Sequence, residues 1–134
     1  MGHLTVHTKI RIARPSRDLA AARAFYVDGL GLSVLYEDLD HDAFAEIVML
    51  GLPGALWHLE LTNARVHHVM PVPTEEDLLV LYLGAPAEPA LIERLQTHGG
   101  TVVPALNPYW ERWAVTVADP DGYRLVLSER HWTP

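Results

Sequence analysis

The sequence predicts an α+β fold in which a unit of one strand, one helix and three strands occurs twice. Segments that alternate apolar and polar residues, the period of a half-buried strand, recur along the chain. Two segments with apolar residues at helical spacing each end at glycine. The order of elements then repeats. Because one such unit leaves a sheet edge unpaired, we expect two units to form a curved mixed sheet with a concave ligand cup.

The first unit spans about residues 3–64. An alternating segment predicts a half-buried strand, and the helix that follows has Ser16 or Asp18 as its possible N-cap. Turn residues then separate three further strands. The predicted elements are a strand at 3–13, a helix at 18–30 and strands at 33–39, 43–50 and 57–63.

A connector with two prolines, about residues 65–75, leads to the second unit at about 76–130. Its last two strands form a hairpin across an Asp-Pro-Asp-Gly turn. The predicted elements are a strand at 76–84, a helix at 86–100, an edge strand at 101–106 and hairpin strands within 112–122 and 123–130. We therefore expect one domain over residues 1–134, built from two modules.

Composition narrows the class of protein. The chain of 134 residues is 49% hydrophobic and 20% charged, as in globular domains. A formal net charge of −7 disfavours nucleic acid and acidic membranes as partners. There is no run of about 18 apolar residues, no signal-peptide pattern and no cysteine. These features predict a cytoplasmic protein without disulfide or thiolate chemistry.

Five motifs spread over nearly the whole chain carry a family resemblance. They are HTKIRIA at 7–13, FYVDGLGL at 25–32, HLELT at 58–62, HGG at 98–100 and DPDGYRLVL at 119–127. In this order on a duplicated unit, they resemble the vicinal oxygen chelate superfamily, which includes glyoxalase I, extradiol dioxygenases, fosfomycin-resistance enzymes and bleomycin-binding proteins. The resemblance implies the glyoxalase/bleomycin resistance/dihydroxybiphenyl dioxygenase fold and a homodimer.

The resemblance also implies four metal ligands in the metal-dependent members, on the first and last strands of both modules. His7 and Glu60 match two of these positions, whereas Leu78 and Val126 match the others and offer no lone pair. Because a zinc-type ion takes three or four protein ligands, we expect no metal cofactor. The alternative is a divalent metal at His7 and Glu60 with His58 as a substitute ligand, in a lyase or dioxygenase of the glyoxalase type.

The strand with the HLELT motif supplies the candidate catalytic residues. His58 and Glu60 lie two residues apart, so they share one face of the strand. Glu60 is a candidate general base, and His58 is suited to orient or share its proton. The alternatives are a rim glutamate paired with Arg11 or Lys9 and a histidine that covers a sheet edge. Arg11 is a candidate anchor for an anionic substrate or a simple ion-pair partner.

The segment NPYWERW at 107–113 supplies candidate aromatic contacts. We expect Tyr109 and Trp110 to line the pocket, and Trp113 to lie on a strand and pack between modules or subunits. Tyr82 shares a strand face with Leu78, so its hydroxyl is expected to point toward the same place. The predicted ligand-binding residues are His7, Arg11, Tyr82, Tyr109 and Trp110.

The sequence thus favours a protein that binds a small organic molecule in the cup, and it leaves open whether a reaction follows. The metal-dependent enzyme is the alternative hypothesis. A third hypothesis is an interaction module that has no ligand, in which Trp110 and Trp113 would plug the cup.

Overall fold

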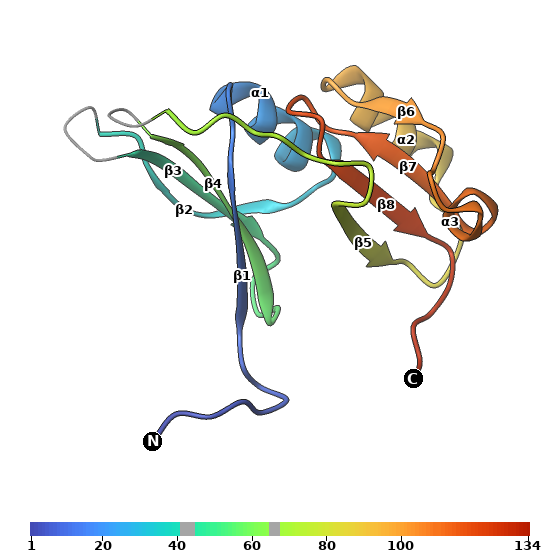
Figure 1. The fold of residues 1–134 in the computed structure, drawn as a ribbon, viewed down its shortest axis with the longest axis horizontal. Helices are drawn as coiled ribbons and strands as arrows, with labels where there is room; N and C mark the ends of the chain where they lie inside the picture. Colours follow the sequence, from blue (N-terminus) through green and yellow to red (C-terminus); the bar gives the residue numbers. More distant parts are fainter. Residues whose placement is uncertain (41–44, 65–67) are drawn as a thin grey trace.

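The computed structural model describes residues 1–40, 45–64 and 68–134. Each half of the chain forms a four-stranded mixed sheet with a helix against one face (Figure 1). In each sheet the first strand of the unit pairs in parallel with the last, and the other pairs are antiparallel. The predicted order of strands and helices is confirmed in both halves, with one additional helix in the second.

The first sheet has the strand order β1-β4-β3-β2. Asp18 is the N-cap, since its Oδ1 accepts the backbone N–H of Ala21 at 3.0 Å. One π-helical turn then extends the helix, and Gly31, with φ +94°, ends it. The elements are β1 (Ile10–Pro15), α1 (Leu19–Ala24), η1 (Phe25–Gly29), β2 (Ser33–Asp38), β3 (Ala45–Gly51) and β4 (Trp57–Ala64).

The prediction that the first strand begins near residue 3 is wrong. The ladder starts at Ile10, which pairs with Trp57, the first residue of β4. Residues before Ile10 alternate in polarity but pair with no strand of the described ranges, and a turn forms where the N–H of Thr8 donates to the carbonyl of Thr5 at 3.2 Å. An alternation of apolar and polar residues does not produce a strand where no neighbouring strand is available for hydrogen bonding.

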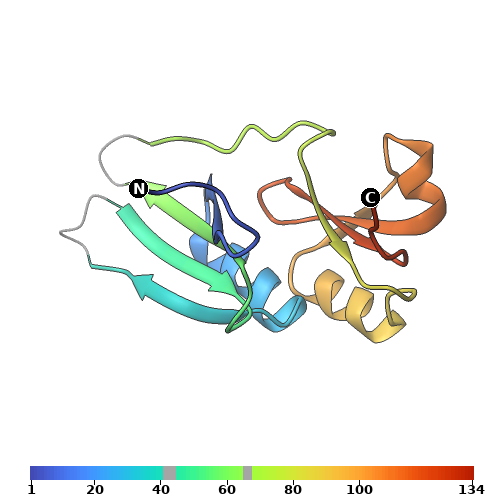
Figure 2. The same cartoon turned by 90° about the horizontal axis from the view of Figure 1, so that it is seen from below.

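The second sheet has the order β5-β8-β7-β6. The connector, described from His68 on, crosses from the first sheet to β5 (Figure 2). The elements are β5 (Leu78–Tyr82), α2 (Pro89–Thr97), β6 (Thr101–Val103), α3 (Pro108–Trp113), β7 (Ala114–Ala118) and β8 (Arg124–Ser128). Among the described residues, no helix has the length and hydropathy that a membrane crossing requires.

The prediction of a strand at Trp113 is wrong, because Trp113 is the last residue of helix α3. The helix has standard start signals. Asn107 Oδ1 accepts the backbone N–H of Tyr109 at 3.0 Å, and Pro108 occupies the first turn, where no donor is needed. The strand β7 begins only at Ala114.

A single apolar core joins the two halves. Side chains under α1, such as Leu59, belong to the same buried cluster as Leu95 of α2 and Leu125 of β8. The helical segments meet closely, since a Cβ at Gly29 would lie 3.2 Å from Leu95 Cδ2. At Gly100 a Cβ would lie 2.6 Å from the carbonyl oxygen of Leu95, so this position excludes a side chain.

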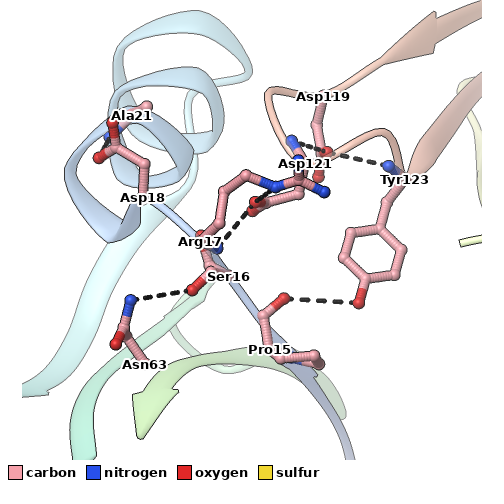
Figure 3. Close-up of polar contacts among 9 residues, drawn as sticks. All are labelled: Pro15, Ser16, Arg17, Asp18, Ala21, Asn63, Asp119, Asp121 and Tyr123. Atoms are coloured by element: carbon pink, nitrogen blue, oxygen red, sulfur yellow. Dashed lines mark hydrogen bonds and ion pairs between the residues drawn. The ribbon is translucent and has the colours of Figure 1, made fainter. Parts of the chain in front are cut away.

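A buried carboxylate strengthens this junction. Asp119 Oδ1 accepts the backbone N–H groups of Asp121 at 2.9 Å and Tyr123 at 3.0 Å, which shapes the turn between β7 and β8 (Figure 3). Its Oδ2 accepts the hydroxyl of Tyr26, from the first module, at 2.6 Å. Burial raises the pKa of Asp119, and burial together with the Asp119 charge raises the pKa of Tyr26 well above 10.0.

The same turn holds the segment that leads from β1 to α1. Asp121 Oδ1 accepts the backbone N–H of Arg17 at 2.9 Å, and the Arg17 Nε lies 3.6 Å from it (Figure 3). The Tyr123 hydroxyl donates to the carbonyl of Pro15 at 3.4 Å. The Asp-Pro-Asp-Gly turn thus fixes the second module against the first.

Candidate functional site

Arg11 contacts three side chains on one face of the first sheet. Its Nε donates to His58 Nε2 at 2.9 Å, and its Nη1 lies 3.8 Å from Glu60 Oε1. Its Nη2 donates to the Met49 sulfur at 3.6 Å. Strand register explains the contacts, because Arg11 pairs directly with His58, and Glu60 follows two residues later on the same face. The donation requires that His58 Nε2 carry no proton.

Two of the predicted site residues are therefore partners of a guanidinium. The Glu60 side chain is 17% exposed and the Arg11 side chain 50%, so the ion pair is only partly shielded from water. Glu60 was expected to be either a general base or an ion-pair partner at the rim. The structure contains the ion pair, with Arg11.

His7 does not join this group. It lies before β1, in the exposed turn, where its backbone N–H donates to Thr5 Oγ1 at 3.1 Å. Within the described ranges, no group of three His, Asp or Glu residues is arranged to hold a metal ion. The Arg11 guanidinium contacts both His58 and Glu60, and a cation between two candidate ligands opposes a second cation there. As arranged in the described part of the chain, His7, His58 and Glu60 do not fit a divalent metal.

A pocket of about 330 Å³ lies on the face of the second sheet that α3 partly covers. Strand residues Leu78, Thr116 and Val126 line it, together with Trp110 of α3. Val126 and Thr116 are buried, whereas the Glu75 side chain is largely exposed and lies at the rim. Leu78 and Val126 are the two positions at which the family resemblance implies metal ligands. Here they form an apolar wall.

Two aromatic residues cluster around Trp110, at one side of this pocket. The ring of Trp110 packs edge-to-face against Tyr109 at 4.9 Å between centroids and lies 6.2 Å from Tyr82. The structure thus brings together the three aromatic residues predicted for ligand binding, and of these Trp110 lines the pocket itself. Trp113 is outside it, and the guanidinium groups of Arg112 and Arg130 lie over its ring, 4.6 and 4.5 Å from the ring centroid.

Most of the charged groups at the pocket have partners. The Arg124 Nη1 donates to the carbonyl of Pro104 at 3.1 Å, and its Nη2 lies 4.0 Å from Glu75 Oε1. Glu76 adds a second carboxylate to the lining. In contrast, the buried hydroxyl of Thr116 has no hydrogen-bond partner among the described residues.

The predicted cup is thus divided between two sheets of this chain. His58, Glu60 and Arg11 lie on the first sheet, whereas Tyr82 lies on the second sheet and Tyr109 and Trp110 lie on the adjoining helix α3. Thr116 and Arg124 were missed as lining residues. The sequence contained a signal for them. The Asp-Pro-Asp-Gly turn fixes the hairpin register, and this register places Thr116 opposite Val126, one of the positions expected to face the cup.

Comparisons with known proteins cover nearly the whole chain. Residues 10–62 match the YycE-like N-terminal domain, and residues 76–129 match the YycE-like C-terminal domain. The chain is 41% identical over 120 residues to YycE of Bacillus subtilis (strain 168), a match that covers 89% of this chain and 86% of YycE.

Solved structures extend the comparison. A crystal structure of a YycE protein from Bacillus subtilis has a TM-score of 0.82 at 37% identity and covers 95% of this chain and 93% of that chain. Leishmania major glyoxalase I has a TM-score of 0.67 at 20% identity, covering 90% and 84%. An antibiotic-binding protein from Streptomyces sp. CB03234 has a TM-score of 0.63 at 23% identity, covering 96% and 100%. At such identities the last two show the fold alone.

Proposed function

The chain belongs to the YycE-like family and has the glyoxalase/bleomycin resistance fold, and from this premise we propose that it binds a small aromatic molecule without a metal ion. The observation that carries the proposal is the pocket beside Trp110. Its wall contains Leu78 and Val126, at the positions where metal-dependent relatives of the superfamily are expected to have ligands. An apolar wall beside an aromatic ring recognises a flat apolar surface.

The size and charge of the pocket limit the ligand. A volume of about 330 Å³ is at the small end of ligand pockets, which suits a molecule of about two fused rings. Glu75 and Glu76 line the pocket, and Arg124 is already bonded to Pro104 and paired with Glu75. The rim therefore disfavours an anion and accepts a neutral or positively charged outer end.

A metal-dependent reaction has less support. It would need His7 beside Glu60, but His7 lies in the turn before β1. It would also need a cation between Glu60 and His58, where Arg11 donates to His58. Binding therefore accounts for more of the described contacts than metal catalysis does.

We also propose that two copies associate. Large apolar side chains are exposed on the edge strand β1 and on the connector, among them Ile12 and Val72, which line the same shallow pocket. Clustered exposed apolar groups on a globular protein mark interfaces. Sedimentation velocity at micromolar concentration should give a dimer that Val72→Asp weakens. The control Val102→Asp, on the exposed edge strand β6, should leave it intact. A wild-type monomer under these conditions would refute the association.

The binding proposal is tested with quinoline as a probe on protein dialysed against a chelator. We expect saturable binding, seen as quenching of tryptophan fluorescence and as a higher melting temperature. Trp110→Ala should weaken it at least about fivefold, the scale of one aromatic contact and its buried area. Trp132→Ala, in the exposed tail, is the matched control and should bind normally. No binding by the wild type, or tightly held metal lost in Glu60→Ala, would contradict the proposal.

A further inference from the structure

Thr116 is a polar residue in surroundings built for an aliphatic one. It lies in the middle of β7, opposite Val126 of β8 and Val103 of β6. The residue is 4% exposed, and its hydroxyl has no hydrogen-bond partner among the described residues. A hydroxyl offers one donor and two acceptor lone pairs, and leaving them unused in the interior costs free energy.

Packing does not require this hydroxyl. Valine has nearly the same shape, prefers strands as strongly, and would match Val103 and Val126 on either side. Threonine is therefore a net cost to the empty protein. A buried polar group that the fold does not use calls for a reason outside the fold.

The position of Thr116 supplies that reason, because it lines the pocket beside Trp110. We infer that Thr116 is a specificity-determining residue, which selects ligands whose inner edge carries an uncharged hydrogen-bonding group such as a ring nitrogen, carbonyl or N–H. This inference rests on the proposed binding function. The Thr116 hydroxyl is shielded from water in the empty pocket, and a turn about χ1 exchanges it with another substituent of Cβ. After this turn the hydroxyl faces the pocket, where a polar group of a bound molecule can form a hydrogen bond with it.

The neighbouring residues explain why the inner group is uncharged. Val126, directly opposite Thr116, and Leu78 give this part of the lining an apolar surface, so an ion placed against them would lose its hydration without gaining a counter-charge. The nearest described cation in the lining, Arg124, is bonded to the carbonyl of Pro104. The ligand class is therefore a flat aromatic molecule with a neutral polar inner edge and a neutral or cationic outer end.

The test compares quinoline with naphthalene, which have the same shape but differ by one ring nitrogen. Dissociation constants of both probes are measured by ligand-observed NMR for the wild type, Thr116→Val and Thr116→Ser. We expect Thr116→Val to lower the preference for quinoline over naphthalene at least about fivefold relative to the wild type. Thr116→Ser keeps the hydroxyl and should keep the preference. Because the ratio of the two dissociation constants is compared between proteins, the difference in hydrophobicity between the probes cancels.

Stability separates this role from a structural one. Thr116→Val should melt at the same temperature as the wild type or higher, because it removes an unpaired buried hydroxyl. If both probes bind at Trp110 and Thr116→Val leaves their ratio unchanged, the inference about Thr116 is overturned and the binding function stands. If neither probe binds the wild type, the binding function fails, and the inference fails with it.

Discussion

Tyr26→Phe isolates the buried contact between the two modules. The substitution keeps the ring, including its edge-to-face contact with Phe25 at 4.8 Å, and removes only the hydroxyl. That hydroxyl donates to Asp119 Oδ2 at 2.6 Å, and both residues are buried. A hydrogen bond to a carboxylate contributes about 1.5 to 3 kcal/mol. We therefore expect a loss of about 2 kcal/mol, or roughly 8 °C in melting temperature for a domain of this size.

Urea and thermal unfolding followed by circular dichroism measure this loss. The matched control is Tyr36→Phe, because Tyr36 is an exposed tyrosine on β2 and its hydroxyl is open to water. The control should change the free energy of unfolding by less than about 0.5 kcal/mol. If Tyr26→Phe behaves like Tyr36→Phe, the buried contact does not hold the modules together, and the account of the junction is wrong.

The same contact predicts a pH dependence. The folded state raises the pKa of Tyr26 above 10.0, so the folded protein keeps a proton that the unfolded chain loses. This stabilisation is fully present below pH 10 and is lost as pH rises toward the folded pKa, with a limiting slope of about 1.4 kcal/mol per pH unit. Tyr26→Phe should flatten the alkaline decline. Burial also raises the pKa of Tyr123, which leaves a residual slope in the variant.

Three further substitutions test other parts of the fold by urea unfolding. Gly100→Ala places a Cβ 2.6 Å from the Leu95 carbonyl oxygen and should cost about 2 kcal/mol or more, whereas Gly2→Ala meets no atom within 4 Å and should cost nothing. Asp18→Ala removes the N-cap of α1 and should cost about 1 kcal/mol; a neutral result would show that the cap is dispensable. Arg11→Ala breaks a half-exposed ion pair and should cost less than about 1 kcal/mol, so a loss above 2 kcal/mol would contradict its surface role.

Elements with strong local signals were predictable from the sequence. Alternation, the cap at Asp18 and the Asp-Pro-Asp-Gly turn led to the repeated strand and helix order that the structure contains. The first strand was too long because its extent depends on where the partner strand β4 begins, which is 47 residues away. Helix α3 was missed because its 6 residues, fewer than two turns, are too short to show helical periodicity, although Asn107 and Pro108 marked its start.

The candidate site was predictable in its residue types but not in its arrangement. Side chains two residues apart on a strand point to the same face, so His58 and Glu60 were correctly placed on a shared face. Arg11 was one of two partners expected for Glu60, and the choice between them depends on the parallel register between β1 and β4, which nothing local specifies. That the Thr116 hydroxyl has no partner in the described part of the chain becomes visible only once the surrounding contacts are known.

The most direct test of metal-free aromatic binding is a quinoline titration of chelator-treated, isotope-labelled protein followed by two-dimensional amide NMR. The account predicts saturable shifts at residues that line the second-sheet pocket, including Trp110, Thr116 and Val126, and unchanged signals at Arg11 and His58. Saturable shifts confined to Arg11 and His58, binding that appears only after a divalent metal is restored, or no saturable shift at all would contradict it.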